Sequence, residues 1–299
     1  MRYLIKSNVN DPYRNLAAEE YMTKQIGAED ELLFLWQNAP TVVIGKNQNS
    51  RAECDLEKME ADGVLLSRRL SGGGAVFHDL GNLCFSFISH EKIHDVTRQL
   101  SVIADACRTF GIDAKPTGRN DVEADGRKFS GNAFYSVGEN KCHHGTVLIS
   151  ADKSRLANYL TVSKTKLEAK GIKSVRSRVV NLCELVPDIT VEAFESALIA
   201  AFAPDMTLPM PSEALFAERA EFLSSREWLL GSDPEFTDEI KYRTDEGEFT
   251  LHLTVRGETV TDCQVFTDSL DSDAAEKIRS KVIGKKLVEV QSSECRVQS

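Results

Sequence analysis

The feature that most constrains the fold is a run of three glycines at positions 72–74, which lies between two short β-forming segments. Arg68 and Arg69 end the first segment, and residues 75–78 form the second. Glycines allow a tight turn and the close approach of a ligand, and the amide groups of such a turn, with two guanidinium groups, can bind an anion. Because the loop leads into a strand and lacks a Gly-Lys-Ser/Thr ending, it is neither a Rossmann fingerprint nor a Walker loop. A plain hairpin with solvated arginines is the alternative that this pattern leaves open.

A second informative stretch centres on the dipeptide Asp125-Gly126, a strong signal for a hairpin turn between two strands. Strand alternation predicts that Lys128 and Ser130 share one face. Asn120 and Asp121 begin the preceding strand. Oxygen ligands together with an ammonium group suit a magnesium-bound phosphate, whereas the plain alternative is an exposed hairpin with ordinary surface charges.

Composition and charge limit the class of protein. The chain has 299 residues, of which 41% are hydrophobic and 27% charged, as in ordinary globular proteins. Its net charge of −10 argues against a nonspecific binder of nucleic acid or anionic membranes. We expect a cytoplasmic protein, because no targeting segment or membrane-length apolar run is evident. The 7 cysteines are scattered without a Cys-x-x-Cys pair, which fits a reducing compartment better than a disulfide or zinc framework.

Periodicity and turn signals predict an α+β fold of mixed, mostly antiparallel strands with interspersed helices. Predicted helices cover residues 12–24, 55–63, 96–110, 192–202, 212–225 and 272–283. Predicted strands cover residues 3–7, 32–36, 41–44, 64–67, 75–78, 83–88, 145–150, 249–255, 259–266 and 286–290. The pattern resets after Pro234, so we predict a large domain over residues 1–236 and a small one over 237–299, with a hinge near 230–240.

One segment of this acidic chain is strongly basic. Between residues 153 and 178, a single acidic residue, Glu168, accompanies eight basic ones. These are Lys153, Arg155, Lys164, Lys166, Lys170, Lys173, Arg176 and Arg178. We interpret the segment as one that closes over a nucleotide or receives an acidic protein partner, with a solvated surface as the alternative.

Taken in order, the motifs resemble those of the lipoate–protein ligase A family. They are Arg-Arg-x-Ser-Gly-Gly-Gly-Ala-Val-Phe-His-Asp from Arg68, Gly-Arg-Asn-Asp from Gly118, Gly-Arg-Lys-x-Ser-Gly from Gly126, His-His-Gly-Thr-Val-Leu from His143, Arg-Leu-Ala-Asn-Tyr-Leu from Arg155, Lys-Gly-Ile-Lys-Ser-Val-Arg-Ser-Arg from Lys170 and Gln-Val-Phe-Thr-Asp-Ser-Leu from Gln264. Each motif is modest evidence, but the ordered set spans nearly the whole chain. The resemblance implies the biotin–lipoate ligase fold, related to class II synthetases, with residues 1–236 as the catalytic domain and residues 237–299 as a small α+β accessory domain.

The resemblance also implies the reaction. Lipoate would attack the α-phosphate of ATP, with Mg²⁺, to give lipoyl-AMP and pyrophosphate. A lysine of a lipoyl carrier domain would then attack the adenylate and release AMP. The implied carriers are the E2 subunits of 2-oxoacid dehydrogenases and the H protein of glycine cleavage. No prosthetic group, nucleic acid or membrane is expected.

The resemblance also implies which residues form the site. Lys128 is the expected catalytic residue, and it would bridge the carboxylate and α-phosphate oxygens. The expected residues for ATP and the adenylate are Arg69, Ser71, Gly74, Ala75, Val76, Phe77, His78, Lys128, Lys173, Arg176 and Arg178. Those expected for lipoate are Leu16, Trp36, Arg69, Val76, Lys128, Ser130, His144 and Gly145, although Leu16 and Trp36 suit a plain core equally well. Asp121 and Asn120 are the expected ligands of Mg²⁺.

Alternatives remain at Cys142, which precedes two histidines. Metal binding there is disfavoured, because His143 and His144 are adjacent on a strand and point to opposite faces. An ATP-independent octanoyl- or lipoyltransferase of the same fold would carry the acyl group on a cysteine such as Cys142. A biotin–protein ligase is disfavoured by the lack of a Gly-Arg-Gly-Arg loop, and a non-catalytic lipoate-binding module is the remaining alternative.

Overall fold

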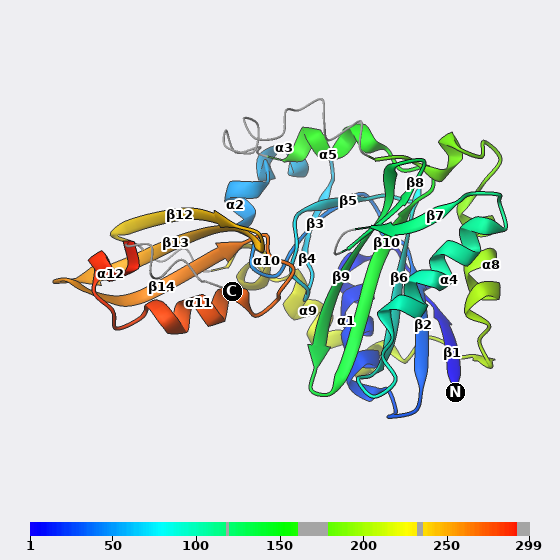
Figure 1. Cartoon of the computed structure of the whole chain (residues 1–299), viewed down its shortest axis with the longest axis horizontal. Coiled ribbons are helices and arrows are strands. Elements are labelled where there is room, and N and C mark those ends of the chain that lie inside the picture. Colours follow the sequence, from blue (N-terminus) through cyan, green and yellow to red (C-terminus); the bar gives the residue numbers. More distant parts are fainter. Residues whose placement is uncertain (118–119, 161–178, 232–235, 292–299) are drawn as a thin grey trace.

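The structure of the protein is a computed structural model that describes residues 1–117, 120–160, 179–231 and 236–291 (Figure 1). The larger part is built on an eight-stranded sheet with the order β11-β1-β2-β6-β10-β9-β8-β7. Its strands are β1 (Arg2–Lys6), β2 (Glu31–Trp36), β6 (Asn82–His90), β7 (Ala114–Thr117), β8 (Asp121–Ala124), β9 (Arg127–Val137), β10 (Asn140–Leu148) and β11 (Met206–Thr207). β1 pairs in parallel with β2 and β11, and the other neighbours are antiparallel. The predicted mixed, mostly antiparallel α+β fold is therefore confirmed.

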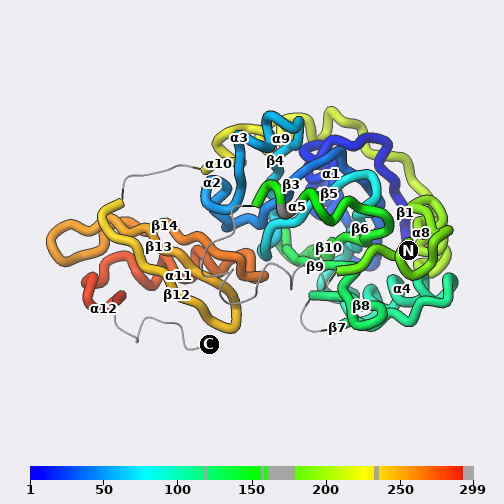
Figure 2. Tube along the Cα trace, turned by 90° about the horizontal axis from the view of Figure 1, so that it is seen from above, coloured from blue at the N-terminus to red at the C-terminus, as the bar shows by residue number. Residues whose placement is uncertain are grey.

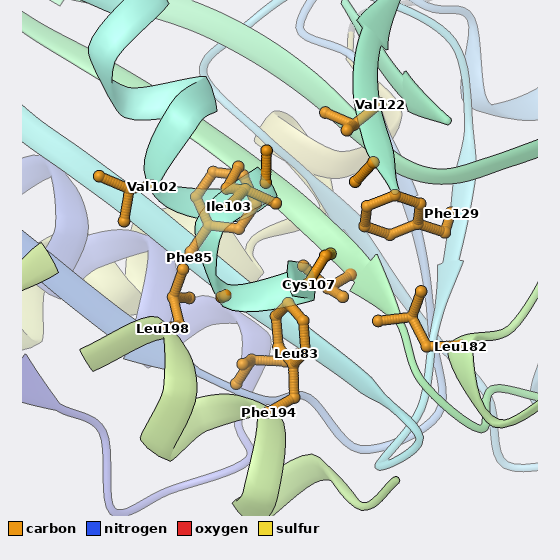
Figure 3. Packing of buried hydrophobic residues seen from close by; sticks show 14 of the residues in the cluster. Leu83, Phe85, Val102, Ile103, Cys107, Val122, Phe129, Leu182, Phe194 and Leu198 are labelled. Carbon is orange, nitrogen blue, oxygen red and sulfur yellow. The ribbon is translucent and has the colours of Figure 1, made fainter. Parts of the chain in front are cut away.

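Helices cover both faces of the large sheet. On one face, α4 (Val96–Arg108) and α8 (Val191–Phe202) pack on β6, and Figure 3 shows Phe85, Ile103 and Leu198 in one cluster. On the other face lie α1 (Pro12–Gln25) and α9 (Ala217–Ser224), which bury apolar side chains against β2 and β6. Every residue of β2 and β6 is buried, as expected for strands covered on both sides.

Local signals in the sequence explain two features near the site. Asp11 caps α1, since its side chain accepts hydrogen bonds from the backbone N–H groups of Tyr13 and Arg14. Pro12 then opens the helix, where its missing N–H costs nothing. The β8–β9 turn has positive φ at both Asp125 (53°) and Gly126 (68°), as a tight hairpin of this sequence requires.

A small three-stranded sheet carries the glycine loop. Its strands are β3 (Thr41–Ile44), β4 (Leu65–Arg68) and β5 (Val76–His78), with β3 in the centre. β3 pairs in parallel with β4 and antiparallel with β5, so the loop at residues 69–75 crosses over the end of β3. The helices α2 (Ser50–Glu53), α3 (Leu56–Ala61) and α5 (Lys153–Tyr159) lie beside this sheet (Figure 1).

The chain then continues through η1 (Leu182–Glu184), η2 (Glu213–Leu215) and α10 (Arg226–Leu230). The helix predicted over residues 212–225 is divided at Phe216 into η2 and α9. None of the helices over the described residues has the length and apolar character that a membrane span requires.

The C-terminal part has its own sheet and core, and it lies at one end of the molecule (Figures 1 and 2). It consists of β12 (Asp238–Thr244), β13 (Gly247–Arg256), β14 (Thr259–Thr267), α11 (Ala274–Val282) and α12 (Leu287–Gln291). The strand predicted over residues 286–290 is wrong, because the chain forms α12 there and only Lys286 bridges to Thr259. Val290 is buried in the C-terminal core and Leu287 packs against it, whereas Val288 is 67% exposed, so the apolar residues of this run pack as one face of a short helix.

Candidate functional site

A cavity of about 190 Å³ lies where the glycine loop and β5 meet the α1 face of the large sheet. Side chains from both sheets, from α1 and from the segment after β14 border it. The lining residues are Leu16, Trp36, Val43, Arg69, Gly73, Gly74, Ala75, Val76, His78, Asn120, Lys128, Gly131, Asn132, Ala133, His144, Gly145, Thr146 and Leu270. Much of this lining is apolar, and the charged groups are few.

Strand register gives the cavity its direction. In one row across the sheet, Trp36 of β2 pairs with Cys84 of β6. Cys84 pairs in turn with Thr146 of β10, and Thr146 pairs with Gly131 of β9. Three strand spacings separate the ends of this row, which is about 14 Å. Because Trp36, Thr146 and Gly131 all line the cavity, it runs across the strands and suits an elongated ligand.

Lys128 stands at the β9 end of this row. Its Nζ lies 2.6 Å from Oδ1 of Asp121, and each of the two side chains is 33% exposed. A Cβ added at Gly131 would lie 3.1 Å from the same Nζ, so the glycine leaves room for the ammonium group beside the cavity. This end of the cavity therefore offers a positive charge that a bound anion can reach.

A β-bulge sets the orientation of Lys128. Val122 pairs with Ser130 but Glu123 pairs with Lys128, so Phe129 is the extra residue of β9. Phe129 and Val122 belong to the core on the other face of the sheet. Ser130 is 1% exposed and does not line the cavity, whereas Lys128 does. The prediction that Lys128 and Ser130 share a face is therefore wrong, because simple alternation ignores the bulge.

The two arginines before the glycine loop hold the backbone in place. Arg69 is buried and donates to the carbonyl oxygens of Gly72 (2.6 Å) and Gly74 (2.8 Å), and to Ser71 Oγ (3.1 Å). Burial lowers its pKa to about 10, so it stays protonated at neutral pH. Arg68 donates to carbonyl oxygens of α10 and of the segment after β3. Arg69 therefore shapes the loop, and its expected anion-binding role stays a prediction. Arg68 does not line the cavity.

The C-terminal part contacts the glycine loop directly. The N–H of Gly73 donates to the carbonyl oxygen of Ser269 at 2.7 Å. A Cβ at Gly72 would lie 2.2 Å from the same oxygen, so only glycine permits this approach. Leu270 lines the cavity from this side. Sequence reasoning missed Leu270 as a site residue, although it ends the motif from Gln264, which was the available signal.

A buried polar network lies against the cavity. His144 Nδ1 is 3.0 Å from both carboxylate oxygens of Glu19, and its Nε2 is 2.6 Å from Ser71 Oγ. Tyr135 and Ser86 also donate hydroxyl groups to Glu19. Since a carboxylate only accepts, His144 carries its proton on Nδ1, and Ser71 donates to Nε2. Sequence reasoning missed Glu19, because a glutamate in a helix resembles any other glutamate until its buried partners are known.

Cys142 lies next to this network. Ligand atoms of Glu19, Cys142 and His144 fall within 4.8 Å of one another, the one such group of three among the described residues. Hydrogen bonds already occupy both nitrogens of His144, so we read the group as a polar network. The Cys142 thiol is fully buried, and burial raises its pKa well above the usual value. His143 points to the opposite face, toward Gln99, as predicted.

The structure gathers most of the predicted site residues at one cavity. Those that line it are Leu16, Trp36, Arg69, Gly74, Ala75, Val76, His78, Asn120, Lys128, His144 and Gly145. Two more lie next to lining residues: Asp121 pairs with Lys128, and Ser71 is hydrogen-bonded to His144. Phe77 instead stacks on Tyr159, with ring centroids 6.0 Å apart. Lys173, Arg176 and Arg178 lie outside the described residues, as do Gly118, Arg119, Lys164, Lys166 and Lys170.

Comparison with known families covers both parts of the chain. The model for the lipoyl protein ligase A/B catalytic domain matches residues 11–203. The model for the bacterial lipoate protein ligase C-terminus matches residues 233–292. Together the two matches cover the large sheet except β1 and β11, the residues that line the cavity and the C-terminal part.

Solved structures give the same result. The chain is similar to P. falciparum LipL1 in complex with lipoate, with 30% identity over 96% of this chain and 90% of that one and a TM-score of 0.83. A chain from a structural analysis of a bipartite lipoate protein ligase and its E2 lipoyl domain, from Thermoplasma acidophilum, is 29% identical over 79% of this chain and 98% of that one, with a TM-score of 0.69. A lipoate-protein ligase A bound with ATP is 26% identical over 77% and 98%, with a TM-score of 0.67.

Proposed function

This chain belongs to the lipoate–protein ligase family, and from that premise we propose that it uses ATP to join lipoate to a lysine of lipoyl carrier domains. In the first half-reaction the lipoate carboxylate attacks the α-phosphate of ATP, which gives lipoyl-AMP and releases pyrophosphate. In the second, the amine of the carrier lysine attacks the acyl carbon, forms the amide and releases AMP. We propose as carriers the E2 subunits of 2-oxoacid dehydrogenases and the H protein of glycine cleavage.

The observation that carries the proposal is the polarity of the cavity. Lys128 stands at one end, and Leu16 and Trp36 contribute an apolar wall toward the other. An acid with a long apolar chain fits this arrangement with its carboxylate at Lys128. The first half-reaction brings two anions together, so a fixed ammonium at that end stabilises the charge that develops on the reacting oxygens.

Other groups would support the nucleotide. Arg69 holds the carbonyl oxygens of Gly72 and Gly74, and this directs the glycine loop around the cavity. Ala75 and Val76 follow the loop and line the cavity, so we assign the adenylate to this side. Buried hydrogen bonds link Glu19 to His144 and His144 to Ser71, and they hold the glycine loop in place.

The residues near Lys128 also fit Mg²⁺, which the family implies. Asp121 brings a carboxylate and Asn120 an amide oxygen, the hard ligands that this ion prefers. Asn120 lines the cavity, and Asp121 lies beside Lys128. When bound there, the ion would offset the negative charge of the phosphates. Lys128 and Asp121 pair with each other, and this keeps the ammonium at the end of the cavity.

The rival reading is an acyltransferase that carries the acyl group on Cys142. A nucleophilic cysteine has to be a thiolate and within reach of its substrate. Cys142 is fully buried, its pKa is raised, and it does not line the cavity. The described structure therefore favours the ligase.

Exchange of pyrophosphate into ATP tests the first half-reaction. We expect exchange that depends on lipoate and Mg²⁺ in the wild-type protein. A folded protein that shows no exchange at saturating lipoate would contradict the proposal, and acyl transfer from a lipoylated donor without ATP would replace it with the transferase.

A further inference from the structure

His78 occupies the end of the cavity that lies away from Lys128. It is the last residue of β5, it lines the cavity, and it is 4% exposed. Its ring meets that of Trp36 edge-on, with centroids 6.1 Å apart. Trp36 ends the row of paired residues that begins at Gly131 beside Lys128, so His78, which contacts Trp36, lies toward the end of the cavity away from the ammonium group.

Neighbouring amides fix the tautomer of this histidine. Asn15 Nδ2 donates to Asn38 Oδ1 at 3.1 Å, and this sets the orientation of the Asn38 amide. Asn38 Nδ2 therefore faces His78 Nδ1, at 3.2 Å, as a donor. Burial lowers the pKa of His78 to about 3, so the ring is neutral and carries a single proton. Because Nδ1 accepts from Asn38, that proton is on Nε2.

The thiol of Cys84 agrees with this assignment. Asn82 Nδ2 donates to Cys84 Sγ at 3.2 Å, which leaves the thiol hydrogen free to donate. Cys84 Sγ lies 3.5 Å from His78 Nδ1, so the thiol can be a second donor to the same nitrogen. The contact with Cys84 is thus compatible with the accepting Nδ1 that Asn38 requires.

His78 Nε2 is buried, and no described residue forms a hydrogen bond with it. His144, the other histidine of the cavity, differs in this respect, since Glu19 and Ser71 occupy both of its nitrogens. A buried donor without a partner is costly, and proteins seldom keep one without a use. The N–H of His78 is therefore available to an acceptor that the ligand brings.

We propose that His78 is a specificity-determining residue whose Nε2–H donates to a sulfur of the dithiolane ring of bound lipoate. The inference rests on the proposed function, because it takes lipoate as the ligand with its carboxylate at Lys128. The ring of lipoate is then at the His78 end. Sulfur is a weak acceptor, whereas a chain of methylene groups offers none, so octanoate would leave this N–H unpaired. The protein thereby prefers a sulfur-containing acyl chain to a plain one.

A matched pair of ligands tests this. Lipoate and 5-cyclopentylpentanoate share the chain and a five-membered ring, but carbon replaces both sulfurs in the second. Titration calorimetry of the full-length protein without ATP gives both dissociation constants. We expect the wild type to bind lipoate about 3- to 10-fold more tightly than the carbocycle, the range for one buried hydrogen bond.

Two variants isolate the donor. His78→Phe removes it and should abolish the preference, while His78→Gln offers an amide N–H and should restore part of it. Equal binding of the two acids by the wild type would overturn the proposal. An equal loss for both acids in His78→Phe, with the ratio kept, would do the same, since His78 would then act on the carboxylate or on the fold.

These measurements distinguish failure of the role proposed for His78 from failure of the proposed ligase function. If lipoate binds with the expected preference but no pyrophosphate exchange occurs, the ligase activity fails and the role of His78 stands. If exchange occurs with equal efficiency for both acids and for His78→Phe, the ligase activity stands and the role of His78 fails. Absence of lipoate binding to the folded wild type would overturn the role of His78.

Discussion

Replacing Lys128 with alanine should lower the rate of adenylate formation by about 10²–10³. The reasoning starts from position: Lys128 Nζ lies at the end of the cavity, beside Gly131 and 2.6 Å from Asp121. Loss of one well-placed donor to developing negative charge costs roughly 3–4 kcal/mol in other enzymes, which sets this range. The second half-reaction should fall as well, because the same oxygens carry the charge when the carrier lysine attacks.

The same substitution should scarcely affect folding. Both members of the Lys128–Asp121 pair are one-third exposed, and ion pairs of this kind stabilise proteins by only about 0–1 kcal/mol. Lys115→Ala is a matched control, because Lys115 pairs with Asp113 at 2.8 Å but is 70% exposed and does not line the cavity. In urea titrations, the free energy of unfolding of Lys128→Ala should lie within about 1 kcal/mol of the wild type, and Lys115→Ala should unfold like the wild type.

Pyrophosphate exchange with lipoate is the assay, run at saturating substrate so that kcat is compared. Lys115→Ala should keep the wild-type rate. A loss of less than about tenfold in folded Lys128→Ala would refute the assignment of Lys128, because a single positioned donor is expected to contribute more than that. A large loss of exchange rate in both variants would mean that removing either lysine charge slows the reaction, so the loss in Lys128→Ala would not be specific to its position.

Three further predictions follow from buried groups. Cys142→Ser should keep most of the exchange activity, since the thiol is buried with a raised pKa; loss of activity in the folded variant would favour the transferase. Gly72→Ala should destabilise the protein by about 1–3 kcal/mol, because its Cβ would lie 2.2 Å from a backbone carbonyl oxygen. Gly74→Ala, with open space around its Cβ, should show no such loss in urea titration, and equal melting of the two would argue against the contact. Stability should fall as the pH drops below about 6.5, by about 1.4 kcal/mol per unit for each of His78 and His143, because the unfolded chain takes up protons that the folded rings, with pKa values of about 3, do not. A flat profile between pH 7 and 5 would contradict this.

Several parts of the fold and site were predictable because short-range signals determine them. The Asp125-Gly126 turn requires positive φ and has it, and Asp11 caps the first helix as its sequence suggests. Lys128 was placed at the site from its motif. These features depend on a few adjacent residues, so the sequence alone specifies them.

Other parts depend on partners far along the chain. Glu19 became recognisable only through His144, which is 125 positions away, and the free N–H of His78 only through Asn38 and Asn15. The bulge that separates Lys128 from Ser130 is a matter of pairing between strands, which alternation does not reveal. The segment after residue 286 was misassigned because its apolar residues suit a short strand or a short helix equally.

The most direct test of the central claim is to incubate the protein with lipoate, ATP, Mg²⁺ and an unmodified lipoyl domain, and to measure the mass of the domain together with the AMP formed. The account predicts one lipoyl group on one lysine for each AMP released, and no modification without ATP. Modification that proceeds without ATP from a lipoylated or octanoylated donor, and that Cys142→Ser abolishes, would contradict it.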